Sequence, residues 1–209
     1  MVDCQIRPTK VTDENIINAF ATVPREAFVG RNQRAIAYVD EDLPLPGGRC
    51  MMEAMVLARL IQALAVGKDD NVLVVGASTG YGAAIMARLA GSVIAVETRT
   101  QMVEKAQETL VSIGTDNAVA IKGPLTAGFA KERPYDAILI EGAVETMPER
   151  ILEQLGNGGR LVAVWRPEDA AVGVASIWTK AGNEFVRKPL FDAQVPVLDE
   201  FRCKRDFVF

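Results

Sequence analysis

The sequence predicts an α/β fold: a Rossmann-like, doubly wound, mostly parallel sheet with helices on both faces. Three observations predict it. Short strand-like segments alternate with helical segments through the middle of the chain. These short segments are apolar at nearly every position, which is typical of parallel strands covered on both faces. A glycine-rich segment, residues 76–82, directly follows the first of them, at a place where α/β sheets bind ligands.

The chain has 209 residues, of which 49% are hydrophobic and 24% charged, enough for one sizeable core. We expect a single domain over 1–209 with three parts. These are an N-terminal helical segment on the expected substrate side (1–66), a ligand-binding α/β core (67–166) and a C-terminal sheet extension (167–209). The net charge is only −4, and the lysines and arginines are scattered, so nucleic acid is not expected as a partner.

The chain contains no histidine, which excludes Ser-His-Asp and Cys-His hydrolases and zinc sites built on histidine. Cys4, Cys50 and Cys203 are far apart and lack metal-ligand spacing, so we expect reduced thiols and no metal. No apolar segment is long enough for a signal peptide or a membrane span. The sequence therefore predicts a cytoplasmic protein with no membrane partner.

The N-terminal part is expected to be mainly helical. Thr12 or Asp13 can cap a helix over 14–21. Two prolines and two glycines in 43–48 predict a turn-rich connector without regular structure. Apolar residues at helical spacing then predict a helix from 52 to about 66, which stops at a glycine.

The middle of the chain carries the alternating pattern. Strands are expected at 71–75, 92–96, 119–121, 135–140 and 160–165, and helices at 83–89, 101–113 and 148–155. Three later segments, 172–178, 185–190 and 205–209, look like strands without a helix between them. We expect these segments to be antiparallel additions at the edge of the sheet.

The segment from Gly76 to Gly82 forms the turn between the first strand and its helix. Its glycines allow the backbone to approach a ligand, and free N–H groups at a helix start favour polar or anionic groups. The spacing is G-x-x-x-G-x-G rather than the G-x-G-x-x-G that packs a dinucleotide, which disfavours a nicotinamide dehydrogenase. The expected contacts with the cofactor come from Gly76, Ala77, Ser78, Thr79, Gly80 and Tyr81.

Glu97 ends the second strand, about twenty residues further on, and is followed by Thr98. A carboxylate at this place can accept hydrogen bonds from both hydroxyls of a ribose. Dinucleotide enzymes use the same device, so Glu97 by itself indicates only a ribose. The glycine turn and Glu97 together predict a nucleoside-type ligand.

Several segments now match, in order, those of one family. The matching segments are 23–29 (VPREAFV), 37–40, 43–45, 72–84, 96–97, 134–138 (PYDAI), 147–155 and 158–162 (GGRLV). In this, the chain resembles protein-L-isoaspartate O-methyltransferases, which belong to the class I S-adenosylmethionine-dependent methyltransferases. The resemblance covers about 25–165 and implies the Rossmann-like fold of that class.

The resemblance implies S-adenosyl-L-methionine as the cofactor and a protein or peptide containing isoaspartyl residues as the substrate. The methyl group passes to a side-chain carboxylate, and the ester collapses to a succinimide that reopens partly as aspartate, a protein-repair reaction. A carboxylate is already ionised at pH 7, so it needs no general base. The lack of histidine is therefore no obstacle. The resemblance also places Gly123, Pro124 and Leu125 along the adenine.

The chain departs from the family pattern at positions that bear on function. Met52 stands where the family has the serine of an Ile-Ser-x-Pro segment, and Ala54 stands at its proline. Val74 replaces an acid before the glycine turn, and Ser78 replaces the middle glycine of that turn. Residues 123–125 (GPL) replace a Gly-Asp-Gly.

Met52, Glu53 and Glu141 are expected to face the methyl acceptor. A methionine cannot donate a hydrogen bond to a carboxylate, and two acids there would repel an anionic acceptor. Three functions are therefore left open. They are a carboxyl methyltransferase, a methyltransferase of the same fold with a cationic or neutral acceptor, and a non-catalytic partner-binding protein.

Overall fold

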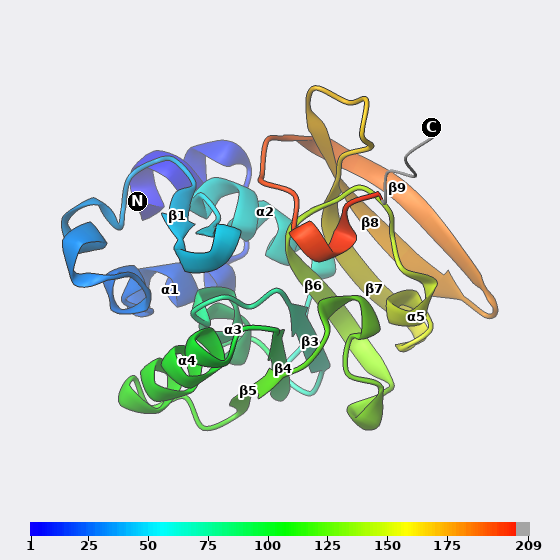
Figure 1. The fold of residues 1–209 in the computed structure, drawn as a ribbon, viewed down its shortest axis with the longest axis horizontal. Helices are drawn as coiled ribbons and strands as arrows, with labels where there is room; N and C mark the ends of the chain where they lie inside the picture. Colours follow the sequence, from blue (N-terminus) through cyan, green and yellow to red (C-terminus); the bar gives the residue numbers. More distant parts are fainter. Residues whose placement is uncertain (204–209) are drawn as a thin grey trace, which may run out of the picture.

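A computed structural model describes residues 1–203, and its centre is a sheet in the order β5-β4-β3-β6-β7-β8-β9 (Figure 1). Its strands are β3 (Asn71–Val75), β4 (Ser92–Glu97), β5 (Ala118–Lys122), β6 (Tyr135–Val144), β7 (Leu155–Trp165), β8 (Gly173–Ala181) and β9 (Glu184–Ala193). The pairs from β5 to β7 are parallel, and β8 and β9 are antiparallel. The predicted α/β sheet and its antiparallel edge are confirmed. The strand expected at 205–209 lies outside the described residues.

The strand order reverses at β3. The chain runs outward from β3 through β4 to β5, then crosses back to place β6 on the other side of β3. The connections that leave β3 and β6 therefore diverge at the carboxyl end of the sheet. Such a switch point is where open α/β sheets form a ligand crevice.

The helices lie unequally on the two faces of the sheet. They are α1 (Glu14–Thr22), α2 (Ala54–Leu64), α3 (Tyr81–Ala87), α4 (Thr100–Ser112) and the single turn α5 (Glu149–Leu152). Val72 and Val74 of β3 pack in the larger apolar cluster with residues of α1 to α4. Leu73 and Val75, on the opposite face, pack with Ile151 of α5 in a smaller cluster. Alternate β3 side chains thus serve two cores.

The helix predicted at 148–155 is shorter than expected. Leu155 already pairs with Tyr135 of β6, so the chain enters β7 directly after α5. The other helices begin and end within a few residues of their predicted bounds. Asp13, and not Thr12, caps α1, because its Oδ1 accepts a hydrogen bond from the backbone N–H of Asn15 at 2.8 Å.

The predicted connector at 43–48 contains regular structure, so that prediction is wrong. β1 (Leu43–Leu45) pairs with β2 (Arg49–Met51) around the tight turn Pro46–Gly48. Leu43 and Leu45 are buried while Pro44 between them is exposed, a pattern that an edge strand tolerates. Gly47 and Gly48 have φ of 70° and 73°, and these left-handed conformations return the chain so that Arg49 enters β2.

Short turns make up the remaining regular elements. The 3-10 turns are Arg7–Thr9, Arg25–Phe28, Arg31–Ile36, Pro46–Gly48, Leu125–Ala127, Ala130–Glu132 and Asp199–Phe201, and Val2–Ile6 forms one π-helical turn.

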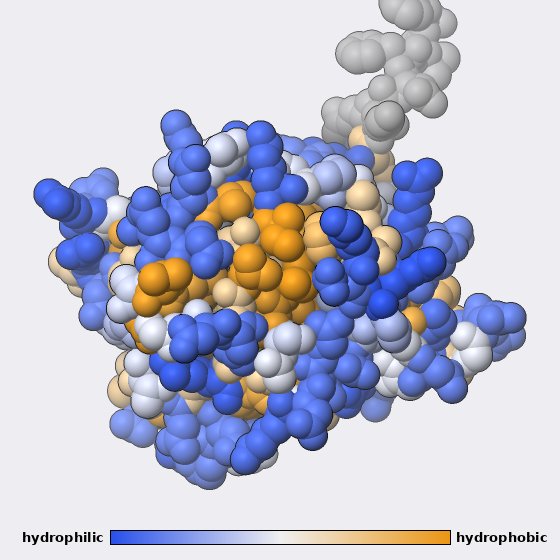
Figure 2. All heavy atoms as spheres, turned by 90° about the horizontal axis from the view of Figure 1, so that it is seen from below, coloured by the Kyte–Doolittle hydropathy of each residue, from blue (hydrophilic) through white to orange (hydrophobic). Residues whose placement is uncertain are grey.

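Figure 2 looks at the molecule from below and shows an apolar area framed by polar side chains. Val111 of α4 and Val119 of the edge strand β5, elements that lie low in Figure 1, are 65% and 40% exposed. Within residues 1–203, we find no helix of the length and apolar character that a membrane crossing requires.

Candidate functional site

The glycine turn between β3 and α3 is tightly folded against β4. The N–H groups of Gly76 and Ala77 both donate to the carbonyl of Val96, at 3.0 and 3.2 Å. Gly76 has φ of 76° and Gly80 has φ of 94°, conformations that favour glycine. Ser78, at the position of a family glycine, also has a positive φ, 51°. The N–H of Ser78 is thereby directed at the end of β4, where Glu97 lies.

Glu97 lies at the centre of a hydrogen-bond network that joins the tip of β4 to the glycine turn. Its Oε2 accepts from the N–H of Ser78 at 3.2 Å. Its Oε1 accepts from the N–H of Thr98 at 2.7 Å, from the Thr98 hydroxyl at 3.0 Å and from the N–H of Arg99 at 3.2 Å. The Glu97 side chain is only 1% exposed. A carboxylate removed from water to this degree must be paired.

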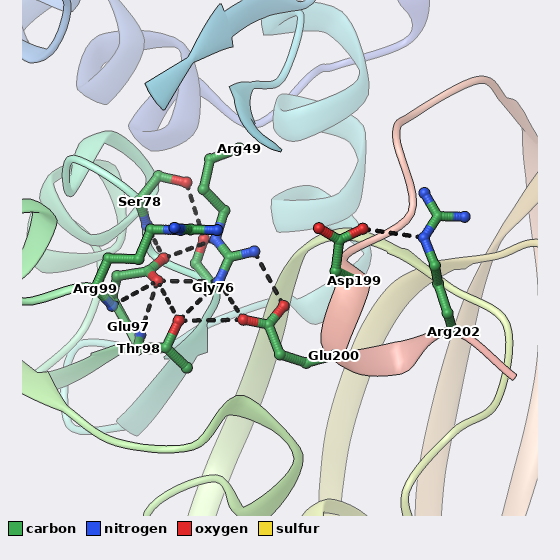
Figure 3. A network of polar contacts seen from close by, with 9 residues as sticks. All are labelled: Arg49, Gly76, Ser78, Glu97, Thr98, Arg99, Asp199, Glu200 and Arg202. Atoms are coloured by element: carbon green, nitrogen blue, oxygen red, sulfur yellow. Dashed lines mark hydrogen bonds and ion pairs between the residues drawn. The ribbon is translucent and has the colours of Figure 1, made fainter. Parts of the chain in front are cut away.

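The partner of the Glu97 carboxylate is Arg49 (Figure 3). No sequence pattern indicated this arginine. Nε and Nη2 of Arg49 each donate to one oxygen of Glu97 at 3.0 Å, in a bidentate ion pair. The other side of the guanidinium donates to Glu200, at 3.0 Å from Nη1 and 2.7 Å from Nη2. Arg49 therefore joins two carboxylates, although its own side chain is 1% exposed. We call Arg49, Glu97 and Glu200 the clamp.

The clamp shifts the pKa values of its members. Burial alone would raise the pKa of Glu97, but the hydrogen bonds and charge of Arg49 outweigh it and hold that pKa below the ordinary value. Burial would lower the pKa of Arg49, and the carboxylates of Glu200 and Glu97 instead raise it. Burial would also raise the pKa of Glu200, and Arg49 instead holds it below the ordinary value. All three groups are therefore ionised at neutral pH, which makes the clamp a network of full charges.

Glu200 reaches the clamp because the segment 195–201 runs beside the end of β6. The N–H of Ala143 donates to Pro196 at 2.9 Å, and the N–H of Leu198 donates to Ala143 at 3.0 Å. Val197 forms a parallel bridge with Ala143. β3 pairs with β6 only as far as Ile140, so the segment 195–201 takes the place beside β6 that β3 leaves. It lies directly over the glycine turn.

Leu198 fills the space above that turn. A Cβ placed on Gly76 would lie 3.1 Å from Leu198 Cδ1, and one placed on Gly142 would lie 2.5 Å from Leu198 Cγ. Leu198 is 3% exposed. The two glycines thus make room for a leucine of the same chain in the crevice where a ligand was expected.

The side of the crevice next to β5 is open. Thr98, Lys122, Gly123 and Pro124 line a shallow hollow beside Glu97. The N–H of Gly123 donates to the backbone carbonyl of Glu97 at 3.0 Å, which fixes the tip of β5 to the tip of β4. Leu125, the third residue expected at the adenine, is buried and does not line this hollow. Of the residues expected to contact adenine, Gly123 and Pro124 therefore line the open hollow near Glu97.

A buried polar cluster lies on the other side of the glycine turn. Glu141 lies within β6, which continues past the predicted strand end at residue 140. It is 5% exposed, and its Oε1 has no hydrogen-bond partner among the described residues. The Tyr81 hydroxyl and Arg25 Nη1 are likewise buried without a partner there. The Arg25 guanidinium carbon lies 4.9 Å from the centre of the Tyr81 ring. Burial raises the pKa of Glu141 to about 8, with a further contribution from Glu97, so Glu141 is mainly protonated at neutral pH.

Gly82 leaves the room that Glu141 occupies, and this predicts a specific defect. A Cβ on Gly82 would lie 2.1 Å from Glu141 Oε1, which no real contact allows. We expect Gly82→Ala to destabilise the protein by about 1–3 kcal/mol through overpacking. The double variant Gly82→Ala/Glu141→Ala should be less destabilised than the sum of its single variants, measured by urea unfolding. Additive losses would mean that Gly82 and Glu141 do not compete for this space.

The residues expected at the acceptor separate into two environments. Met52 is 1% exposed, and its carbonyl accepts from Arg25 Nη2 at 2.7 Å. Glu53 is the N-cap residue of α2, and its N–H donates to Asp42 Oδ1 at 2.8 Å. Burial, and then the charges of Asp42 and Asp40, raise the pKa of Glu53. Met52 therefore lies beside Arg25, whereas Glu53 belongs to an acidic group with Asp40 and Asp42.

The strand order, the glycine turn after β3 and the acid at the tip of β4 together define the fold of a class I S-adenosylmethionine-dependent methyltransferase. Comparisons with known proteins give the family. Residues 1–190 match the family model described as protein-L-isoaspartate(D-aspartate) O-methyltransferase. The protein-L-isoaspartate O-methyltransferase of Koribacter versatilis (strain Ellin345) is 37% identical over 200 residues, 95% of this chain and 89% of the relative. That of Methanoculleus marisnigri is 36% identical over 169 residues, 81% of this chain and 77% of the relative.

Solved structures agree on the fold. A structure described as a protein-L-isoaspartate O-methyltransferase has a TM-score of 0.82 at 24% identity, covering 95% of this chain and 66% of its own. A Plasmodium falciparum structure described as this enzyme in complex with S-adenosyl-L-homocysteine has a TM-score of 0.78 at 18% identity, covering 93% and 94%. The chain belongs to the protein-L-isoaspartate(D-aspartate) O-methyltransferase family, and by family it is a carboxyl O-methyltransferase with S-adenosylmethionine as cofactor.

The crevice in this structure does not fit an adenosyl group. Both oxygens of Glu97 are already bound by Arg49 and by backbone N–H groups, so none is left for the hydroxyls of a ribose. Leu198 lies against Gly76, where the ligand would approach the turn. Glu97 and the glycine turn are the residues expected to bind the cofactor, and Arg49 and Leu198 of the same chain lie against them.

Proposed function

We propose that this chain methylates the side-chain carboxylate of isoaspartyl residues in damaged proteins, as a cytoplasmic repair enzyme. Family membership over residues 1–190 is the observation that carries this proposal. The contacts assigned to the cofactor are part of it: the turn 76–81, Glu97 with Thr98, and residues 123–125. The proposed location in the cytoplasm is supported by Cys4, Cys50 and Cys203, which are all free thiols.

The residues that face the methyl acceptor do not have to supply a general base. An isoaspartyl carboxylate is ionised at neutral pH, so it is nucleophilic without a base. The protein has to hold it in line with a methyl group and exclude water, which is catalysis by proximity. A chain without histidine can do this.

Glu141 supports an anionic acceptor, although the sequence suggested that its charge would repel one. As an ionised acid it would repel a carboxylate. Its raised pKa of about 8 leaves it neutral at pH 7, and a protonated carboxyl has an O–H to donate. We propose that Glu141 supplies the hydrogen bond that Met52, at the family's serine position, cannot supply.

The proposal is tested by incubating the protein with methyl-labelled S-adenosylmethionine and an isoaspartyl peptide. Base-labile methyl ester should form, and the labelled methanol released from it should exceed that from the matched aspartyl peptide. Equal release from the two peptides, in a preparation that binds S-adenosylhomocysteine, would reject the isoaspartyl acceptor and leave the methyltransferase assignment standing.

Restoring a hydroxyl at residue 52 should raise this activity. Met52→Ser places a hydrogen-bond donor at the family's serine position, and one such bond contributes about 0.5–1.5 kcal/mol. We expect kcat/KM for the isoaspartyl peptide to rise by about 2–10-fold. Met55→Ser is the matched control, since Met55 is half-buried on α2 and lies outside the proposed site. An equal rise in both variants would argue against a role for residue 52.

A second acceptor class is supported by the acidic group around Glu53. Burial raises the pKa of Asp42 and of Glu53, and Asp40 adds a further negative charge to the environment of Glu53. Such a group suits a cationic or neutral acceptor better than an anion. Transfer of label to amines or phenols, with none to the isoaspartyl peptide, would favour this alternative.

A further inference from the structure

The clamp occupies the position that the proposed function assigns to the cofactor's ribose. Glu97 stands at the tip of β4, where the ribose hydroxyls would bind, and the Arg49 guanidinium makes two hydrogen bonds to it. Two guanidinium N–H groups can match a carboxylate in the same way as two vicinal hydroxyls. Arg49 is thus bound as a ligand would be.

The cover over the clamp comes from the far end of the chain. Glu200, 151 residues from Arg49 in sequence, holds the outer side of the guanidinium and also accepts from the Thr98 hydroxyl at 3.1 Å. Leu198, two residues earlier, closes the space over Gly76. One segment therefore supplies both the apolar side chain over Gly76 and the acid that holds Arg49 in place. Figure 3 shows Glu200 of this segment beside Arg49.

The two groups that would have to move to open the site, Arg49 and the segment 195–201, are attached by short elements. Arg49 lies on a three-residue strand, and the two glycines before it have positive φ. The segment 195–201 is held beside β6 by backbone hydrogen bonds near Ala143 and between Glu145 and Phe201, and not by a long ladder. Glu200 is 26% exposed, in contrast to the buried Arg49 and Glu97. The outer ion pair is therefore the part of the clamp that water reaches first.

We propose that the clamp and Leu198 form an autoinhibitory closure, in which Arg49 is an internal occupant of the ribose position and the cofactor binds only after Arg49 and residues 195–201 move away. This inference rests on the proposed function, because it presumes that Glu97 binds the cofactor in the open form. The open form is the fraction of molecules competent to bind, so the measured Kd equals the intrinsic Kd divided by that fraction.

The test uses a variant that loosens the closure without touching Glu97. Glu200→Gln removes the charge that holds the outer side of Arg49 and leaves the inner pair in place. Asp199→Asn is the matched control. Asp199 is the neighbouring acid on the same turn, and it pairs with the exposed Arg202 instead of Arg49. The ligand is S-adenosylhomocysteine, titrated by calorimetry into each protein of 209 residues.

We expect Glu200→Gln to bind S-adenosylhomocysteine about 10-fold more tightly than the wild type, with Asp199→Asn unchanged, because a larger fraction is open. Hydrogen exchange of residues 195–201 should become faster when the ligand is added to the wild type. Equal Kd values in all three proteins, with unchanged exchange, would overturn the closure and leave the proposed function standing. No binding to any of them at millimolar ligand would overturn both.

Discussion

Arg49→Met should lower the free energy of unfolding of the ligand-free protein by about 3–5 kcal/mol, because it leaves a buried carboxylate without its cation. The Glu97 side chain is 1% exposed, so water cannot replace Arg49 without opening the site. The backbone N–H groups of Ser78, Thr98 and Arg99 remain and solvate only part of the charge. Urea unfolding at pH 7 measures the loss.

The double variant Arg49→Met/Glu97→Gln separates the charge effect from lost packing. Glutamine is neutral and still accepts from the backbone, so we expect the double variant to be more stable than Arg49→Met alone. Arg202→Met is the control for an exposed arginine; its side chain is 51% exposed, and the loss should stay below about 1 kcal/mol. A loss of the same small size in Arg49→Met would show that the clamp is not a buried ion pair.

The loss of unfolding free energy in Arg49→Met should depend on pH in a definite direction. The pKa of Glu97 is lowered in the folded protein, so its contribution to stability is present above the ordinary value of 4.5. That contribution disappears as the pH falls through the lowered pKa. The difference between wild type and Arg49→Met should therefore narrow in acid.

Glu141→Gln should stabilise the protein in alkali and have little effect in acid. The pKa of Glu141 rises from 4.5 to about 8 on folding, so the unfolded chain releases this proton at a lower pH than the folded one. Between these two values the wild type loses stability as the pH rises, at about 1.36 kcal/mol per unit. At pH 9 the wild type should carry a penalty of about 3–5 kcal/mol that the variant lacks.

Urea unfolding of wild type and Glu141→Gln at pH 5, 7 and 9 measures this difference. Glu104→Gln is the control, since Glu104 is exposed on α4, and its stability should follow the wild type at every pH. A constant difference between wild type and Glu141→Gln from pH 5 to 9 would mean that Glu141 ionises normally in the folded protein. Its proposed role as a donor to the acceptor would then fail.

The sheet and the glycine turn were predictable because their signals are local. Apolar strands recur at regular intervals, and the turn 76–82 follows one of them directly. Glu97 was predictable for the same reason, since it ends the next strand. The bounds of α5 were missed because they depend on the pairing of Leu155 with Tyr135, a contact between segments that the local pattern does not show.

The occupants of the crevice were not predictable from the sequence. Arg49 and Glu97 are 48 residues apart, and Arg49 and Glu200 are 151 apart, with no periodicity to join them. A single arginine after a Pro-Gly-Gly turn has no distinguishing pattern. Glu141 was found because a strand was expected to end before it, although β6 continues to Val144. Its protonation depends on burial against Gly82, which only the folded structure shows.

A crystal structure of the protein grown with S-adenosylhomocysteine tests the assignment of the crevice most directly. The account predicts that both ribose hydroxyls contact the Glu97 carboxylate, that the base lies in the hollow beside Gly123 and Pro124, and that Arg49 and Leu198 have moved aside. An intact Arg49–Glu97 pair under Leu198, with the ligand bound elsewhere or absent at saturating concentration, would contradict it.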